Sequence, residues 1–566
     1  MKIALAQLNP TVGHVESNAK AIVRAIDESR GLGADLVVFS EMAICGYPPR
    51  DLLLVDGFVE RCASAVKSIG EQHTAGIAVV IGTPLPAGDG VDGNDDGIAN
   101  SVVVYEDNAF VGYHDKRLLP TYDVFDEDRY FVPGDRSVVV EVAGKRIGLA
   151  ICEDLWRGDD SGFSSRYDDE ADHVQGLIEA GAEVIVAPSA SPFVLGKADK
   201  HRGILRGHAT THGVPVVSVN QVGANDDLIF AGQSCVVDSR ARTVHECEAF
   251  AESVAVVDLE SSREVSHRVL DDERAIVEAL TMGIRDYLRK CGFKKACIGL
   301  SGGIDSALVA ALGVRALGGE HVVGASMPGR FSSEGSKTDA FALAENLGMR
   351  CVSMPIETGF QGVSESLNPA FGELGERELG ASLPDLTQEN LQSRIRGTMM
   401  MALSNRTGAL VLTTGNKSEI AVGYCTLYGD MNGGLAVIAD VPKTMVFKVC
   451  RYMNEHYAEL GFDCPPIPVS TIEKPPSAEL APDQLDSDSL PDYEVLDVIV
   501  QRHIEGHQSA SKIIAETGFD AGEVERICKL IDRNEYKRQQ MAVGLKLTTT
   551  AFGTGRRMPI AQRWTR

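Results

Sequence analysis

The chain has 566 residues, of which 44% are apolar, and its formal net charge is −26 at pH 7. This length exceeds what one hydrophobic core normally supports, so two large domains or three smaller ones are expected. The acid excess and the lack of a basic cluster exclude an ordinary nucleic-acid binder. The sequence contains no run of about 18 apolar residues, so it predicts no membrane span. The opening MKIALAQLNPTVG predicts a strand rather than a signal peptide.

The 12 cysteines are scattered along the chain and form no CxxC pair. This spacing, without a predicted signal peptide, indicates reduced thiols in a cytoplasmic protein. Most of these cysteines are expected to be small buried apolar residues.

The first half alternates β-rich runs with helical patterns, which predicts a layered α/β domain around a largely buried sheet. Helical patterns cover residues 18–31 and 173–180, and an acidic glycine-rich loop is predicted at 88–97. The predicted strands begin at Lys2, Leu36, Ile77, Ser101, Arg146, Glu183, Val214 and Val254.

A polar segment, Leu259 to Glu273, predicts a domain boundary. We therefore expect domains at 1–262 and 273–566, with a linker at 263–272. Beyond the boundary the βαβ alternation restarts, which is typical of a doubly wound parallel sheet. Its predicted helices are 274–290, 307–317, 338–347 and 389–405, and its predicted strands are 295–300, 322–328, 351–356 and 409–415.

Two polar stretches, 362–385 and 472–493, are too long for ordinary connections. They are predicted to be lids or disordered loops.

The stretch GLSGGIDSA, Gly299 to Ala307, lies between an apolar strand and an apolar helix. Gly302 and Gly303 allow a sharp turn and a close approach to a ligand. The helix that follows directs its first N–H groups at the loop, which favours an anion. An ordinary glycine-rich turn is the alternative, and the missing GK[ST] ending excludes a Walker loop.

This stretch resembles the pyrophosphate loop of the N-type ATP pyrophosphatases, which cleave ATP to AMP and pyrophosphate. Four further stretches, in this order, resemble the NAD synthetases of that group across nearly the whole second half. They are ENLQSRIRGTMMMALSN from Glu389, LTTGNKSEIAVGYCTLYGD from Leu412, IEKPPSAEL from Ile472 and RNEYKRQQ from Arg533. The resemblance implies a Rossmann-like doubly wound domain.

The resemblance also implies individual roles. Asp305 and Glu419 would bind Mg²⁺, a metal that carboxylate oxygens suit; whether Glu419 contacts metal, deamido-NAD or both stays open. The implied ATP contacts are Gly299, Leu300, Ser301, Gly302, Gly303, Ile304, Asp305, Ser306 and Thr414. The implied deamido-NAD contacts are Asn390, Arg394, Glu419 and Lys537.

In the first half, GLAICEDLW places Cys152 at the end of a predicted buried strand, directly before Glu153 and Asp154. A core cysteine is one explanation, and an activated nucleophile is the other. Glu41 ends LVVFSE, and Lys116 lies in YHDKRLLP.

Together, these contexts resemble the Glu-Lys-Cys triad of the nitrilase (carbon–nitrogen hydrolase) superfamily over residues 1 to 260. The resemblance implies a four-layer α-β-β-α sandwich and an amidase, with Glu41 as base, Lys116 at the oxyanion and Cys152 as nucleophile. It also implies glutamine contacts at Tyr122, Glu153, Ser191 and Lys197. Asp154 receives no catalytic role, and we expect it to hold the strand-end turn.

The two resemblances together imply membership of the glutamine-dependent NAD synthetases. Glutamine hydrolysis would supply ammonia, and deamido-NAD, activated by ATP with Mg²⁺, would be amidated. An N-type pyrophosphatase with another acceptor, or an ammonium-only synthetase with an inactive first domain, are the alternatives. The expected partners are these small molecules and further copies of the chain in a dimer or octamer, without nucleic acid or membrane.

Overall fold

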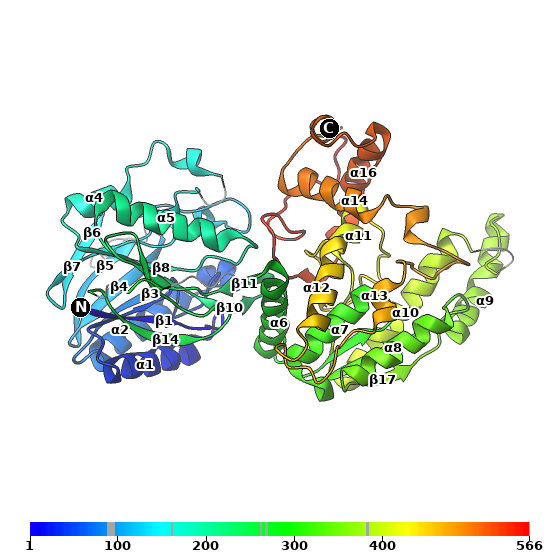
Figure 1. Ribbon diagram of the computed structural model, residues 1–566, viewed down its shortest axis with the longest axis horizontal. Coiled ribbons are helices and arrows are strands. Elements are labelled where there is room, and N and C mark those ends of the chain that lie inside the picture. The colour runs from blue at the N-terminus through cyan, green and yellow to red at the C-terminus, as the bar shows by residue number, and fades with distance from the viewer. Residues whose placement is uncertain (88–96, 160–161, 261–262, 266–269, 381–383, 565–566) are drawn as a thin grey trace. The chain divides into compact units, whose positions relative to one another are not determined.

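The computed structural model describes residues 1–87, 97–159, 162–260, 263–265, 270–380 and 384–564. The chain forms two compact units, Met1–Leu270 and Asp271–Arg566 (Figure 1). The predicted linker, 263–272, spans the point where one unit ends and the next begins. The predicted acidic loop, 88–97, lies outside the described residues apart from its last glycine.

Two six-stranded sheets form the centre of the first unit, with strand orders β14-β1-β2-β3-β4-β5 and β13-β12-β9-β8-β7-β6, and β10 pairs with β11 in a separate hairpin. The strands are β1 Lys2–Gln7, β2 Leu36–Phe39, β3 Ala78–Pro86, β4 Ile98–Glu106, β5 Ala109–Asp115, β6 Val138–Val142, β7 Lys145–Leu149, β8 Val184–Ser189, β9 Val216–Asn220, β10 Val222–Asn225, β11 Leu228–Ala231, β12 Cys235–Val237, β13 Thr243–Glu246 and β14 Ser253–Asp258. The helices are α1 Val15–Gly31, α2 Phe58–His73, α3 Glu153–Trp156, α4 His173–Glu179 and α5 Lys197–His212.

Side-chain alternation along the strands produces the layers of this unit. In β1, Ile3 and Leu5 face the core between the two sheets, whereas Ala4 and Ala6 face the core under the helices, as the two-residue period of a strand requires. Helices α1 and α2 cover the first sheet, and α4 and α5 cover the second (Figure 1). The predicted four-layer α-β-β-α sandwich is therefore confirmed.

The second unit is built on one parallel sheet, β17-β16-β15-β18-β19-β20. Its strands are β15 Ala296–Gly299, β16 Val322–Ser326, β17 Arg350–Ser353, β18 Leu410–Thr413, β19 Leu435–Ala436 and β20 Val543–Gly544. Its helices are α6 Asp272–Lys290, α7 Ile304–Leu317, α8 Glu334–Asn346, α9 Glu357–Leu374, α10 Leu386–Thr407, α11 Lys417–Val422, α12 Lys443–Glu455, α13 Val469–Glu473, α14 Tyr493–Val500, α15 Ala510–Thr517, α16 Ala521–Arg533 and α17 Glu535–Arg538.

Helices cover both faces of this sheet. Cys297 of β15 and Val411 of β18 pack with Met400 of α10 on one face, whereas α7 lies over Ile298 and Leu412 on the other. The predicted doubly wound sheet is confirmed. The strand order reverses between β15 and β18, and in such sheets ligands bind beyond the carboxyl ends of the strands at this reversal.

One sequence prediction is wrong. Residues 362–385 were expected to be a lid or a disordered loop, but α9 extends through residue 374 and contains Pro369. The helix packs on the rest of the unit mainly through Phe360, which clusters with Ile356 and Ile395. The segment contains many polar residues and glycines, and this composition made the helix resemble a loop.

The second long stretch, 472–493, is irregular apart from the end of α13, a single 3₁₀ turn at Asp486–Asp488 and the first residue of α14. Its role as a lid stays a prediction. All 12 cysteines are free thiols. In the part of the chain that the structure describes, no helix combines the length and apolarity needed to cross a membrane.

Candidate active sites

The three predicted triad residues each follow a strand of the first unit: Glu41 follows β2, Lys116 follows β5 and Cys152 follows β7. All three are almost completely buried. The Lys116 ammonium donates a hydrogen bond to Glu41 Oε1 at 2.8 Å. The Cys152 thiol lies close enough to both for their charges to act on its pKa. The structure therefore brings the predicted triad together.

Cys152 occupies a strained turn between β7 and α3. Its φ of 45° and ψ of −101° lie outside the regions that ordinary residues adopt, and its backbone N–H donates to the Pro188 carbonyl at 3.0 Å. Burial and the Glu41 carboxylate raise the pKa of the thiol well above its usual range, although Lys116 acts in the opposite direction. A thiol whose pKa is raised in this way needs a base to remove its proton before attack.

Glu41 is held by several groups at once. Besides Lys116, the Asn100 amide donates to Oε1 at 2.7 Å, and the Ala190 backbone N–H donates to Oε2 at 2.9 Å. A carboxylate held by three donors has a defined orientation, which general-base catalysis requires.

Glu127 is a fourth residue of this cluster, and our sequence reasoning missed it. Lys116 Nζ donates to its Oε1 at 2.9 Å, and the Tyr47 hydroxyl donates to the same oxygen at 2.7 Å. Burial raises the pKa of Glu127 to about 7, against the lowering effect of Lys116. The only signal available beforehand was an acidic residue within the aromatic stretch VFDEDRYF, downstream of the lysine.

The predicted glutamine contacts form two pairs. The Tyr122 hydroxyl donates to Glu153 Oε2 at 2.8 Å, and Glu153 directly follows the predicted nucleophile in the chain. Lys197 Nζ donates to Ser191 Oγ at 3.2 Å. Ser191 and Lys197 line a cavity of about 60 Å³, whereas Tyr122 and Glu153 are not among its lining residues.

Asp154 connects two of the triad-bearing segments. Its Oδ1 accepts hydrogen bonds at 3.0 Å from the backbone N–H groups of Arg117 and Leu118, and its Oδ2 accepts one at 2.9 Å from Ile151. His114 Nε2 lies 3.1 Å from Oδ2. The prediction that Asp154 holds the strand-end turn is confirmed, and the same carboxylate also fixes the residues after Lys116.

A larger cavity, of about 310 Å³, opens at the strand-order reversal of the second unit. It is lined by the loop after β15 and by residues that follow β18, α11 and α13. Of the predicted ATP contacts, those that line it are Gly299, Leu300, Ser301, Gly303, Ile304, Asp305, Ser306 and Thr414.

The remaining glycine of the loop, Gly302, has a φ of +76°, which favours glycine. A Cβ on Gly302 would lie 2.3 Å from the Ser336 carbonyl oxygen, so a side chain has no room there. Ser301 Oγ accepts a hydrogen bond from the Gly303 N–H at 3.1 Å, and Ser306 Oγ donates to the Gly303 carbonyl at 2.9 Å. The loop is therefore compact, and it leads directly into α7 at the cavity wall.

The two predicted metal ligands converge on one cation. Lys443 Nζ donates to Asp305 Oδ2 at 2.5 Å and to Glu419 Oε1 at 3.0 Å. Burial raises the pKa of Glu419 to about 7, with Lys443 acting in the opposite direction. Hard carboxylate oxygens that already share one cation are a donor set that fits Mg²⁺. No spacing in the sequence distinguishes Lys443 from a surface lysine, so it was missed.

The other predicted deamido-NAD contacts do not line the cavity. Instead, they brace the loop after α11. The Thr426 hydroxyl donates to Asn390 Oδ1 at 2.9 Å, and Arg394 Nε donates to the Leu427 carbonyl at 3.2 Å. Lys537 Nζ donates to the Gly423 and Cys425 carbonyls, each at 2.7 Å. Because Cys425 lines the cavity, these contacts position its wall.

Both units match models of known families. Residues 2–268 match the carbon–nitrogen hydrolase family, and residues 276–541 match the NAD synthase family. The glutamine-dependent NAD(+) synthetase of Synechocystis sp. is 46% identical, with 99% of this chain and 98% of the relative covered. The chain belongs to the glutamine-dependent NAD(+) synthetases. The predicted family is thereby confirmed.

Two further comparisons agree with this membership. The glutamine-dependent NAD(+) synthetase of Rhodobacter capsulatus is 41% identical over 100% of this chain and 98% of the relative. The solved glutamine-dependent NAD+ synthetase of Acinetobacter baumannii, in complex with adenosine diphosphate, is 36% identical, with a TM-score of 0.75 over 99% of this chain and 98% of its own. These relatives align with both halves of the chain over nearly its full length. The family consists of ligases.

Proposed function

We propose that the first unit hydrolyses the side-chain amide of L-glutamine and that the second unit uses the ammonia, with ATP, to convert deamido-NAD⁺ to NAD⁺. One observation carries the proposal. A single chain holds a buried carboxylate–lysine pair beside a buried thiol, and a separate cavity with a glycine-rich loop beside convergent carboxylates. The first site suits an amide, and the second suits a nucleotide.

Glutamine hydrolysis follows from the positions of the first cluster. Glu41 takes the proton from the Cys152 thiol, and the sulfur attacks the amide carbon. Lys116 stabilises the oxyanion that develops. Glu41 then gives its proton to the leaving ammonia, which leaves a thioester on Cys152. Water attacks the thioester after losing a proton to Glu41, and glutamate and the free thiol are released.

The synthetase reaction requires activation of a carboxylate. The nicotinate carboxylate of deamido-NAD⁺ attacks the α-phosphorus of ATP, and pyrophosphate leaves. Ammonia then attacks the resulting acyl-adenylate, and AMP leaves. Ser301 and the N–H groups of its loop would hold the departing phosphates. Mg²⁺, held by Asp305 and Glu419, would neutralise phosphate charge. Asn390, Arg394 and Lys537 would shape the deamido-NAD⁺ site through the loop that they brace.

The Cys152→Ala variant tests the coupling of the two units. NAD⁺ formation should disappear with glutamine and persist with ammonium chloride, since the variant removes only the nucleophile of the first site. Both rates can be measured by enzymatic detection of NAD⁺. Cys62→Ala, which removes another buried thiol of the same unit, is the matched control and should keep both activities.

Equal glutamine-dependent rates for Cys152→Ala and the unsubstituted protein would contradict the proposal. They would favour an ammonium-only synthetase with an inactive first unit. An assembly of several copies and a cytoplasmic location stay predictions. Light scattering would distinguish a monomer, a dimer and an octamer.

A further inference from the structure

The irregular segment of residues 474–485, here named the strap, forms one wall of the larger cavity through Lys474, Ser477 and Glu479. The strap lies between α13 and the 3₁₀ turn at Asp486–Asp488. The Lys474 backbone N–H still donates to the Ser470 carbonyl of α13 at 3.0 Å. Beyond Lys474 no helix or strand fixes the backbone of the strap, so its position there depends on individual contacts.

The Glu479 carboxylate makes the most extensive of these contacts. Its Oε1 accepts hydrogen bonds from Ser336 Oγ at 2.6 Å and from Ser333 Oγ at 2.9 Å, and its Oε2 accepts one from the Ser333 N–H at 3.3 Å. Ser333 is the N-cap of α8. One side chain of the strap is therefore bonded three times to the start of a helix, where the helix dipole also favours a negative charge.

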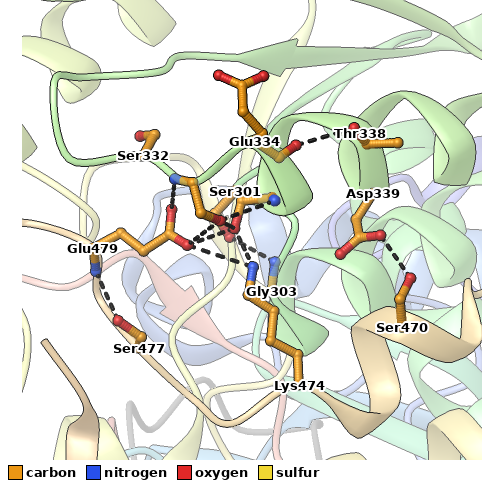
Figure 2. Close-up of polar contacts among 12 residues, drawn as sticks. Ser301, Gly303, Ser332, Glu334, Thr338, Asp339, Ser470, Lys474, Ser477 and Glu479 are labelled. Atoms are coloured by element: carbon orange, nitrogen blue, oxygen red, sulfur yellow. Dashed lines mark hydrogen bonds and ion pairs between the residues drawn. The ribbon is translucent and has the colours of Figure 1, made fainter. Parts of the chain in front are cut away.

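The same contacts lead to the pyrophosphate loop. Lys474 Nζ donates to Ser336 Oγ and lies 3.4 Å from Glu479 Oε1. The Ser336 backbone is the surface against which Gly302 packs. Figure 2 shows Lys474 and Glu479 directed toward each other beside Ser301 and Gly303. Glu479, Ser336 and Gly302 thus form a continuous path from the strap to the loop.

The backbone of Glu479 indicates that this arrangement is imposed by its contacts. Its φ of +49° is unfavourable for a residue with a side chain. A second attachment is weaker, because the Gln392 amide donates to the Leu480 carbonyl through one neutral hydrogen bond of 3.0 Å. Hydrogen bonds to a charged group are worth more than neutral ones, so the carboxylate is the principal attachment of the strap.

We propose that Glu479 is a positioning residue that holds the strap against α8 and thereby sets the Lys474 ammonium beside the pyrophosphate loop. There the ammonium faces the phosphate groups of ATP, which rests on the proposed assignment of this cavity to ATP. Glu479 touches none of the reacting atoms. Its loss weakens ATP binding and leaves the rate of the bound complex unchanged.

The test is Glu479→Gln, a neutral variant of nearly the same shape, assayed for NAD⁺ formation with ammonium chloride. The KM for ATP should rise about tenfold, with kcat within about twofold, because the lost interaction acts on binding. Glutamine hydrolysis without ATP should be unchanged. Proteolytic cleavage within the strap should become faster without nucleotide.

Glu345→Gln is the matched control. Glu345 is an exposed carboxylate of the same helix, α8, and it does not line the cavity, whereas Glu334 is unsuitable because it pairs with the cavity-lining Lys337 at 2.7 Å. This variant removes the same charge and should keep the KM for ATP. Ser336→Ala should raise that KM, and adding it to Glu479→Gln should produce less than the product of the two effects.

An unchanged KM for ATP in Glu479→Gln would overturn the proposal. A lowered KM would also overturn it, because the carboxylate would then be an anion that phosphate has to displace. If Glu479→Gln fails to fold, Ser336→Ala decides by the same criterion. Asp305→Ala separates the two proposals: if it loses amidation while Glu479→Gln matches the unsubstituted protein, the ATP site stands and the role of Glu479 is wrong.

Discussion

The two candidate sites differ in how they are built. In the first unit, Glu41, Lys116 and Glu127 are buried and joined by hydrogen bonds of 2.8 and 2.9 Å, and none of them lines the cavity of about 60 Å³ beside Ser191 and Lys197. In the second unit, the cavity measures about 310 Å³, and an irregular strap forms part of its wall. The difference follows from the chemistry. Attack on one amide needs fixed groups around a small substrate, whereas binding two nucleotides needs space and a wall that can move.

The largest expected effect is a loss of NAD⁺ formation at the second site alone. Asp305→Ala removes a carboxylate that contacts Lys443 and Asn416. NAD⁺ formation should fall about 10²- to 10³-fold with either nitrogen source, since the phosphates lose preorganised charge stabilisation. Steady-state assays with glutamine and with ammonium chloride measure this loss. Glutamine hydrolysis should persist, and Glu525→Ala, on the exposed side of α16, should keep full activity. Full ammonium-dependent activity would remove Asp305 from the site.

A smaller effect tests whether the first site depends on a fixed scaffold. Asp154→Asn replaces one carboxylate oxygen with an NH₂ group that meets backbone N–H donors. The kcat for glutamine hydrolysis should fall about 10- to 100-fold, because Lys116 and Cys152 lose their common support. The ammonium-dependent reaction should not change. The exposed Asp159→Asn serves as the control, and the comparison fails if both variants hydrolyse glutamine equally fast.

A further expected effect, on stability and not on catalysis, concerns pH. Burial lowers the pKa of His173 from 6.5 to about 4, although Asp154 acts in the opposite direction. Folding keeps the imidazole neutral, whereas the unfolded chain protonates it below pH 6.5. The stability that this residue contributes is therefore complete above pH 6.5 and is lost as the pH falls through about 4, the pKa in the folded protein. This loss is worth up to about 3 kcal/mol. The thermal midpoint should therefore fall less between pH 7 and 4 in His173→Gln than in the unsubstituted protein.

The exposed His14→Gln is the control for this pH dependence. It should follow the unsubstituted protein across the range. Parallel curves for all three proteins would contradict the role of His173.

Sequence patterns predicted the candidate triad of the first unit, because its members follow strands. The runs that end near Glu41, Lys116 and Cys152 are apolar and short, and the polar residue after each run is conspicuous. Glu127 was missed because it lies in a 3₁₀ turn, where no periodic pattern separates a buried acid from an exposed one. The second site was predicted through its glycine-rich loop, whereas Lys443 was not, since a single lysine carries no pattern.

The α9 prediction failed for a related reason. Composition reports how polar a segment is, but a mostly exposed helix and a loop can be equally polar. Only packing, in this case of Phe360 against Ile356 and Ile395, distinguishes them.

The amino-acid sequence by itself determined the two-unit α/β organisation, the family and the candidate site residues, because strand periodicity, glycine-rich turns and motif order are local properties of the chain. The tertiary structure alone decided which charges meet. Lys116 pairs with Glu127, Lys443 pairs with Asp305 and Glu419, and Asp154 joins two active-site segments. These partners come from separate elements, and only folding brings them within hydrogen-bonding distance and removes the water that would otherwise weaken their interaction.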